Sequence, residues 1–179
     1  VEYFIVCEKV EGEEYVHDLE RLRDGASLRE EDEARASALA SYLAYIHSHR
    51  RGDAKLYIRR IRELLGHSEC IFGLTDSYPS ESEFITRAEL KEIEKLCIEW
   101  RWKLKSKTNR LCMVHGDFHP WNVIFHTRTG TDFTLLDRSR GEWGEAADDI
   151  TAMTINYLFF GLLKTDGAVI DADFKRLYE

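Results

Sequence analysis

Residues 114–125, "VHGDFHPWNVIF", hold several polar side chains whose types and spacing suit catalysis. Asp117 and Asn122 lie five positions apart, and a second carboxylate, Asp137, ends the later apolar run "TLLD". A carboxylate can orient a hydroxyl group and accept its proton, and amide and carboxylate oxygens are ligands that Mg²⁺ prefers. This combination fits phosphoryl transfer from a Mg-bound nucleotide, in which the protein positions the reactants and neutralises charge.

These polar residues are predicted to lie in a loop between two strands. Pro120 fixes its own φ angle and disfavours a helical conformation at His119, so the stretch is not the middle of a helix. Short apolar runs flank it, "LCMV" before and "NVIF" after, and the turn "TRTGTD" separates "NVIF" from "FTLLD". The pattern predicts a small β-hairpin region that holds the loop at both ends.

Most of the remaining chain is predicted to be helical. Candidate N-caps precede the segments in which apolar residues recur at helical spacing: Ser27 and Thr86, each with a glutamate three positions on, then Asp53 and Asp171. The predicted helices cover about residues 28–49, 54–66, 87–106 and 146–163, with a loop over 67–83. We therefore expect an α+β fold that is mainly helical.

Length, charge and cysteine content exclude several classes of protein. A chain of 179 residues can bury one sizeable core, and its net charge of −8 argues against a nucleic-acid partner. The chain contains no apolar run long enough for a membrane span and no signal peptide at its start, so we expect no membrane partner and a cytoplasmic location. Its four cysteines are scattered, which indicates reduced thiols rather than a zinc ribbon or a disulfide scaffold.

The start of the chain predicts a buried strand. The run "YFIVCEKV" is apolar and rich in β-branched residues, and it predicts a strand over about residues 3–9, almost at the start of the sequence. A strand with no preceding partner indicates that an upstream sheet is not part of this sequence. We therefore expect the chain to be a fragment of a longer protein.

The loop, together with "LLDRSRGEWGEAADDIT", resembles the aminoglycoside phosphotransferase and choline kinase family, which has a protein-kinase-like fold. The family's loop reads His-Gly-Asp-x-His-x-x-Asn, followed by an Ile-Asp-rich segment and then Gly-Asp-Pro-x-x-Asp-Leu-Ala. The resemblance implies that Asp117 is the catalytic base and that Asn122 and Asp137 are ligands of Mg²⁺. It also implies that His115 anchors the loop, and we expect His119 to make structural hydrogen bonds.

The later part of the resemblance assigns Gly144 and Asp149 to the Gly-x-x-x-x-Asp element, whose aspartate supports the catalytic loop. Here Glu145 and Ala146 replace the family's Asp and Pro, and Asp148 beside Asp149 leaves the assignment open by one position. Arg138 and Arg140 follow the metal aspartate and either contact phosphate oxygens or neutralise the nearby acids. A final set is either an amine-binding surface or solvated acid: Glu142, Glu145, Asp148, Asp149, Asp166, Asp171 and Asp173.

The opening residues resemble the hinge that joins the two lobes of this family. In "FIVCEKVEG" the backbone of Cys7, Glu8 and Lys9 would bind the adenine of a nucleotide. The resemblance implies an interlobe strand and hinge over residues 1–12 and the helical C-terminal lobe over 13–179. The N-terminal nucleotide lobe would then be a missing partner, present in the full-length protein.

The function expected is an ATP- or GTP-dependent transfer of the γ-phosphate to a hydroxyl group of a small molecule, aminoglycoside-like or choline-like. One alternative is a kinase-like module that binds a partner without catalysis. A second takes His115 and Asp117 with a distant histidine as ligands of an Fe(II) oxygenase, which requires a β-rich double sheet. Trp121 and Trp143 are expected to be packing residues.

Overall fold

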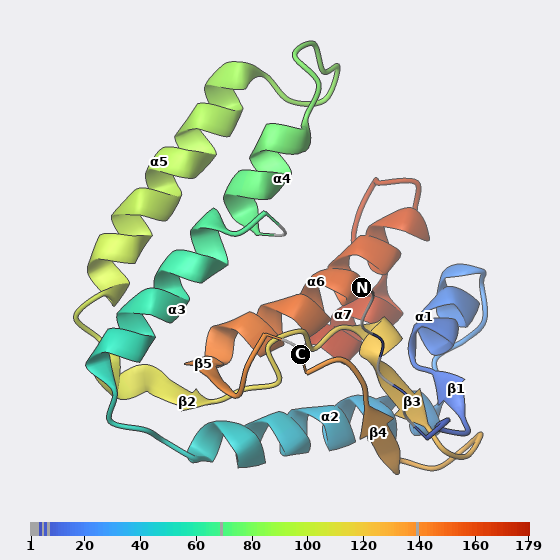
Figure 1. Cartoon of the computed structure of the whole chain (residues 1–179). Coiled ribbons are helices and arrows are strands. Elements are labelled where there is room, and N and C mark those ends of the chain that lie inside the picture. Colours follow the sequence, from blue (N-terminus) through green and yellow to red (C-terminus); the bar gives the residue numbers. More distant parts are fainter. Residues whose placement is uncertain (1–3, 5, 7, 69, 139) are drawn as a thin grey trace. The chain divides into compact units, whose positions relative to one another are not determined.

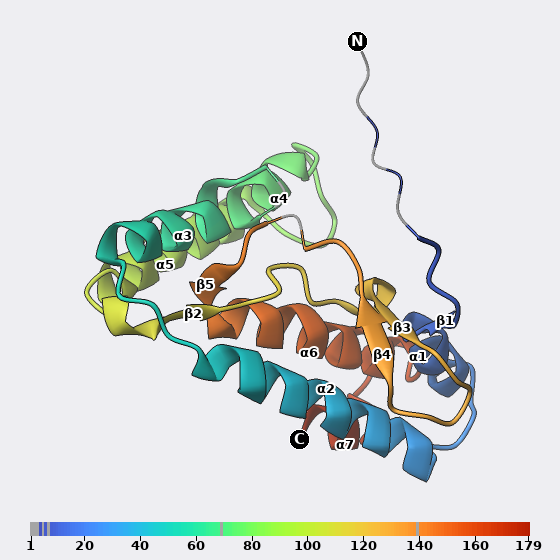
Figure 2. The same ribbon diagram turned by 60° about the horizontal axis from the view of Figure 1, so that its bottom comes forward.

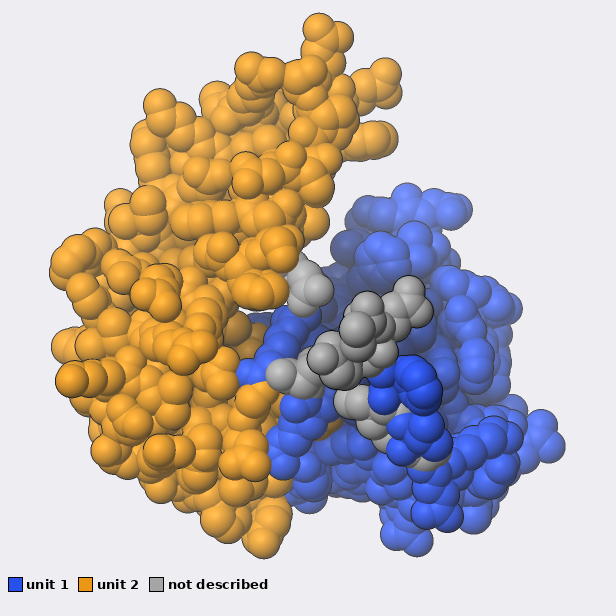
Figure 3. Space-filling view, in the orientation of Figure 1, with its two compact units in different colours: residues 1–44, 117–140, 149–179 blue, residues 45–116, 141–148 orange. Residues whose placement is uncertain are grey.

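The computed structural model describes residues 4, 6, 8–68, 70–138 and 140–179. The fold is mainly helical, with two small antiparallel sheets among the described residues, as the α+β prediction requires. The chain forms two compact units, which Figure 3 shows in blue and orange. Unit 1 comprises residues 1–44, 117–140 and 149–179, and unit 2 comprises residues 45–116 and 141–148. Within the described ranges, no helix is both long and apolar enough to cross a membrane.

Unit 1 combines a three-stranded sheet with helices. Its elements are β1 (Glu13–Glu14), α1 (Val16–Arg23), most of α2 (Glu30–Ser48), the 3-10 helix η2 (Pro120–Asn122), β3 (Val123–Phe125), β4 (Phe133–Leu135), most of α6 (Ala146–Leu163) and α7 (Ala172–Tyr178). The strand order is β1-β3-β4, and both pairs are antiparallel (Figures 1 and 2). Its core includes buried aromatic residues from four elements or their borders: Tyr15, Phe125, Tyr157 and Phe174.

Unit 2 is built around α3 (Ala54–Gly66). It also contains α4 (Ile71–Ser77), α5 (Arg87–Leu104), the 3-10 helix η1 (Thr108–Arg110), β2 (Leu111–Met113) and β5 (Trp143–Glu145). Tyr57, Ile61 and Leu111 form its buried core, and Leu104 and Trp143 pack against them. The antiparallel pair β2-β5 joins segments about 30 residues apart in sequence, with Cys112 opposite Gly144.

Local caps begin the helices largely where the sequence predicts. The Asp53 side chain accepts a hydrogen bond from Leu56 N at 3.0 Å, and Thr86 forms the predicted capping box. The cap of α2 differs from the prediction, because Asp32 Oδ2 accepts from Arg29 N at 2.8 Å directly before the helix. A helix has unsatisfied N–H groups at its start, so each of these acceptors stabilises a helix end.

The structure corrects three predictions. At the described positions 4, 6, 8 and 9 no strand forms, and Phe4 and Val6 are 85% and 84% exposed rather than buried. An apolar β-branched run becomes a strand only where another strand pairs with its backbone, and the described pairings include none here. The predicted loop over 67–83 contains α4, and β5 was not predicted.

Candidate active site

The part of the predicted catalytic loop in unit 1 is held by its own backbone. His119 N donates to Asp117 O at 3.0 Å, and Asn122 N donates to His119 O at 2.9 Å. Pro120 starts the short helix η2 at a position where its missing N–H leaves no bond unmade. The predicted loop is thus confirmed, and it ends at Asn122, the residue directly before β3.

The side-chain amide of Asn122 has a defined orientation. Its Nδ2 donates to the main-chain oxygen of Asp117 at 3.0 Å, and this carbonyl can only accept, which fixes the amide against a flip. The same Nδ2 lies 3.1 Å from His119 Nε2, which must accept because an NH₂ group only donates. The amide oxygen of Asn122 is therefore the atom left for other ligands, and the His119 ring contacts the amide nitrogen.

Asp137 stands at the same end of the hairpin as Asn122. The ladder pairs Val123 with Leu135, and Leu136 N donates to Asn122 O at 2.9 Å, immediately before Asp137. The Asp137 side chain is exposed, and its backbone has a φ of 53°, in the left-handed region that L-residues rarely adopt. Strained backbone of this kind concentrates at functional sites, where surrounding structure holds it in place.

Asp117 is partly buried, with a histidine and an arginine near its carboxylate. Its Oδ2 lies 3.6 Å from His119 Nε2, and its Oδ1 lies 3.4 Å from Arg140 Nη2. The sequence left open whether Arg140 neutralises acid or contacts phosphate oxygens. The structure directs its guanidinium at the predicted catalytic carboxylate.

Tyr42 on α2 links several of the predicted residues within unit 1. Its ring stacks on Phe118, with ring centres 6.1 Å apart, and meets Phe133 edge-on at 5.6 Å. Burial raises the pKa of the Tyr42 hydroxyl, the positive charge of Arg138 opposes this rise, and the carboxylate of Asp149 adds to it. The Tyr42 hydroxyl is therefore close enough to Arg138 and Asp149 for both charges to shift its pKa, and the Tyr42 ring packs on Phe118, the residue after Asp117.

Asp149 and Asp148 differ in burial, which bears on their uncertain assignment. The Asp149 side chain is fully buried in α6, whereas Asp148 is only partly buried. A buried carboxylate is retained only where it is paired or hydrogen bonded, so it suits a supporting role better than a surface carboxylate does. Asp149 is thus the better match to the supporting aspartate that the resemblance implies.

The residues of the motif that belong to unit 2 lie around β2 and β5. His115 is 1% exposed, and Gly116 has a φ of 89°, a conformation in which glycine is strongly favoured. Val114 N donates to Glu142 O at 2.9 Å. Gly144 packs closely on β2, and an added Cβ would lie 3.0 Å from Val114 Cγ2, a tight contact that favours glycine at this position.

Glu145, which replaces the family's aspartate, is enclosed by partners in unit 2. Arg110 donates from Nε and Nη2 to the two carboxylate oxygens at 2.5 to 3.0 Å, and the Tyr57 hydroxyl donates to Oε2 at 2.8 Å. Burial opposes ionisation of Glu145, but the hydrogen bonds from Arg110 and Tyr57 outweigh it and hold the pKa of the carboxyl below its usual value. The negative charge of Glu145 is therefore balanced by Arg110 within unit 2.

Two further acids from the candidate amine-binding set also have internal partners. In unit 1, Lys164 Nζ lies 3.0 Å from Asp171 Oδ1 and 3.2 Å from Asp173 Oδ2. Asp171 in addition accepts from Asp173 N and caps α7, as the sequence predicts. These two acids, like Glu145, serve the fold, which favours ordinary internal pairing over an amine-binding surface for these three.

The predicted hinge residues are only partly described. Cys7 lies outside the described residues, whereas Glu8 and Lys9 are described and exposed. Lys9 Nζ forms an exposed ion pair with Glu11 Oε1 at 3.1 Å. Their binding of a nucleotide base remains a prediction.

No group of three or more His, Cys, Asp and Glu side chains suited to a metal ion occurs among the described residues. Mg²⁺ in nucleotide sites takes only one or two protein oxygens, and the remaining ligands are phosphates and water. The oriented amide oxygen of Asn122 and the exposed carboxylate of Asp137 provide such a pair of hard oxygen donors. The residues present therefore fit Mg²⁺ better than a metal that requires several nitrogen or sulfur ligands.

Sequence reasoning missed two residues that the structure connects to this region. Tyr42 counted only as one apolar position in a helical repeat, and Arg35 was not distinguished from other surface charges. Arg35 is 5% exposed, although it lies in a helix with many charged residues. A basic residue at a position that helical spacing assigns to the buried face was the available signal.

Comparison with known proteins identifies a family. No curated protein and no solved structure matches the chain. The model of the phosphotransferase enzyme family matches residues 2–175, nearly the whole sequence. The chain therefore belongs to the phosphotransferase enzyme family.

Proposed function

We propose that this protein transfers the γ-phosphate of ATP or GTP to a hydroxyl group of a small molecule, with Asp117 as the catalytic base. Membership of the family implies a protein-kinase-like fold, in which such a base stands on a loop. The observation that carries the proposal is the oriented Asn122 amide, which joins the Asp117 backbone to the β3–β4 hairpin that bears Asp137.

In the proposed reaction, Asp117 orients the acceptor hydroxyl and takes its proton. The acceptor oxygen forms a bond to the γ-phosphorus, and the bond from that phosphorus to the β–γ bridging oxygen breaks, which releases ADP or GDP. Arg140, near the Asp117 carboxylate, adds positive charge where the phosphoryl oxygens are negative. His119 keeps Asn122 oriented through its Nε2.

Asn122 and Asp137 would hold the Mg²⁺ ion. When bound, this ion neutralises charge on the nucleotide phosphates. Asp137 would present its exposed carboxylate from a left-handed backbone, a conformation that Asp166 also adopts in a turn of the described chain.

The remaining motif residues have supporting roles in the proposal. We assign residues 13–179 to the helical C-terminal lobe and residues 1–12 to the hinge, with Cys7, Glu8 and Lys9 next to the nucleotide base. The buried side chain of His115 anchors the loop, and the buried carboxylate of Asp149 supports it.

Two alternatives are weighed against this proposal. An Fe(II) oxygenase requires a large double sheet, whereas the sheets in the described chain have three and two strands. A kinase-like module without catalysis keeps the fold but has no need for a base. Retention of Asp117, Asn122 and Asp137 supports the catalytic reading over this module.

The first experiment is a screen of hydroxyl acceptors with the full-length protein, read out as consumption of ATP or GTP. Aminoglycosides and choline-like alcohols are the first compounds to test. We expect phosphorylation of at least one acceptor, and loss of it in Asp117→Ala while nucleotide binding survives. Turnover that is unchanged in Asp117→Ala would exclude Asp117 as the base.

A second experiment separates the kinase from the oxygenase. We expect the full-length protein to bind an ATP analogue only when Mg²⁺ is present, and Asp137→Ala to lose this Mg²⁺-dependent binding. Calorimetric titration with and without Mg²⁺ measures both. Binding that requires Fe(II) and a 2-oxoacid instead would support the oxygenase.

A further inference from the structure

We propose that Arg35 is a positioning residue that fixes the geometry of the β3–β4 hairpin and thereby the spacing of Asn122 and Asp137. The consequence for the metal ion rests on the proposed function. The effect on the hairpin itself does not. Arg35 belongs to α2, and its partners on the hairpin lie more than 90 residues later in the chain.

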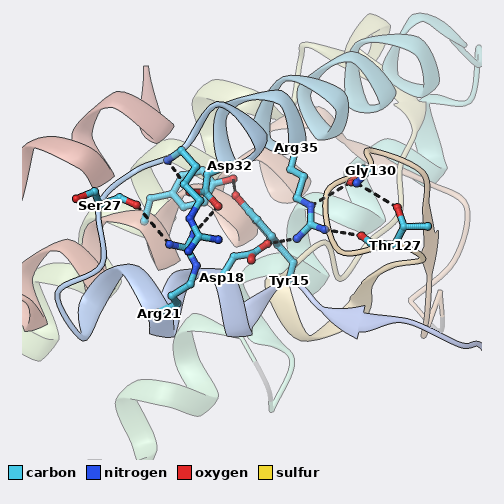
Figure 4. A network of polar contacts seen from close by, with 10 residues as sticks. Tyr15, Asp18, Arg21, Ser27, Asp32, Arg35, Thr127 and Gly130 are labelled. Carbon is cyan, nitrogen blue, oxygen red and sulfur yellow. Dashed lines mark hydrogen bonds and ion pairs between the residues drawn. The ribbon is translucent and has the colours of Figure 1, made fainter.

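The side chain of Arg35 bonds to two other segments of unit 1 (Figure 4). Its Nη2 donates to Thr127 O at 2.7 Å and its Nε donates to Gly130 O at 3.1 Å, both in the turn between β3 and β4. Its Nη1 donates to the carboxylate of Asp18 on α1. The turn is therefore tied by its main chain to two helices.

The chemistry of these contacts requires arginine. A guanidinium group presents five donors in a rigid plane, so it can serve two carbonyl groups and a carboxylate at once. The Cζ atom of Arg35 also lies 4.3 Å from the centre of the ring of Phe125, the last residue of β3. Lysine would keep the charge, but it has neither the fork nor the flat face that stacks on an aromatic ring.

The turn is closed at its base by the bond from His126 N to Asp132 O at 3.1 Å and has little other regular structure. Residues 126–132 contain no helix or strand, and most of their side chains are exposed. Gly130 N donates to Thr127 Oγ1 at 3.1 Å, so the two carbonyl groups that Arg35 holds also belong to one closed loop. Hairpin register depends on the length and form of the turn, so the residue that holds this turn specifies the register.

Register at the turn determines geometry at the other end of the hairpin. Asn122 precedes β3, and Asp137 follows β4 just after the bond from Leu136 N to Asn122 O. A slip by one residue moves β4 by about 3.3 Å along β3 and reverses the faces of its side chains. Such a shift would separate the two proposed metal ligands.

Unit 1 offers a matched control for Arg35. Arg21 Nη2 donates to the buried carboxylate of Asp32 at 2.5 Å, and its Nη1 donates to Ser27 O at 3.3 Å (Figure 4). Like Arg35, it joins α1 to α2 through a carboxylate and a carbonyl group. Its hydrogen bonds stay within residues 21–32, so Arg21→Lys disturbs a comparable ion pair without touching the hairpin.

The test compares Arg35→Lys with Arg21→Lys in the full-length protein at a temperature where both are fully folded. We expect Arg35→Lys to raise the Mg²⁺ concentration for half-maximal turnover by about tenfold, the low end for supporting residues of metal sites. Its KM for the acceptor should stay unchanged. Arg21→Lys should leave the Mg²⁺ requirement at the wild-type value.

Amide hydrogen exchange provides a readout that needs no activity. We expect the Leu136 amide to exchange about tenfold faster in Arg35→Lys than in Arg21→Lys, relative to the amides of α6. If Arg35→Lys does not fold, Asp18→Asn removes the carboxylate that orients Arg35 and should produce the same changes at smaller size.

The outcomes separate this proposal from the proposed function. Equal Leu136 exchange in the two variants overturns the role of Arg35 in the hairpin. Faster exchange with an unchanged Mg²⁺ requirement supports that role and overturns its consequence for the spacing of Asn122 and Asp137. A wild-type protein that binds no Mg-nucleotide overturns the proposed function. In that event, the Leu136 amide decides alone whether Arg35 holds the hairpin.

Discussion

Glu145 and Asp137 each lie at the end of a short strand, but their carboxylates have opposite surroundings. Glu145 ends β5 in unit 2, is buried, and receives hydrogen bonds from Arg110 and Tyr57. Asp137 lies just beyond β4 in unit 1 and is exposed on a left-handed backbone. The charge of the first acid is balanced by Arg110 inside the fold, which it stabilises, whereas the second acid is exposed to solvent. The contrast distinguishes an acid that stabilises the fold from an acid that is accessible to a bound metal ion or substrate.

The largest expected effect comes from Asp117→Asn, which keeps the shape of the side chain and removes the base. General base catalysis contributes about 10² to 10⁴-fold, so we expect turnover to fall about 10³-fold, or about 4 kcal/mol in the barrier. Steady-state assays of the full-length protein measure this loss. Since Asp117 is only partly buried, its free energy of unfolding should change by less than about 0.5 kcal/mol.

The same acid-to-amide change at Glu145 should have the opposite profile. Breaking a fully buried ion pair costs about 3–5 kcal/mol, but the Arg110 side chain is 44% exposed and can rehydrate. We therefore expect Glu145→Gln to lower the free energy of unfolding by about 2 kcal/mol, measured by urea denaturation. Tyr57→Phe, which removes one donor and keeps the ion pair, should cost about 1 kcal/mol. A loss in Glu145→Gln no larger than that in Tyr57→Phe would contradict the expectation that the ion pair contributes more than the Tyr57 hydrogen bond.

Acid should remove part of this stability without any substitution. The pKa of Glu145 is lower in the folded protein than its ordinary value of 4.5, so its contribution is complete above that pH. The contribution is lost as pH falls from 4.5 through the lower folded pKa, because the protein must then protonate a paired carboxylate. Denaturation at a series of pH values should show a steeper fall in wild type than in Glu145→Gln. Parallel curves would contradict the assignment.

The parts of the fold that sequence predicted are those whose causes lie close together in the chain. The caps at Asp53, Thr86 and Asp171 depend on residues two or three positions away, so the local sequence is enough to predict them. The strands around the loop were found for the same reason, because Pro120 and the apolar runs on each side are local signals.

The missed features depend on distant partners. The strand β5 has three residues, one of them Gly144, and its pairing with β2 lies about 30 residues away, so no local pattern indicates it. Arg35 makes its decisive bonds to carbonyl groups of Thr127 and Gly130, and a bond to main chain leaves no mark on the identity of the partner residue. The loop that carries Asp117 and Asn122 was therefore predictable, whereas helical spacing indicated only that Arg35 is buried and not which groups it contacts.

The smallest effect should separate the backbone of Asp137 from its carboxylate. Asp137→Gly and Asp137→Ala both remove the acid, but only glycine adopts a φ of 53° without a steric cost. A left-handed conformation costs an ordinary residue about 1–2 kcal/mol, partly offset because glycine is more flexible when unfolded. We expect Asp137→Gly to be about 1 kcal/mol more stable than Asp137→Ala, by urea denaturation. Equal loss of Mg²⁺-dependent nucleotide binding in the two variants would show that the left-handed backbone of Asp137 only presents the carboxylate. A difference in binding between them would show that the backbone itself contributes to the site.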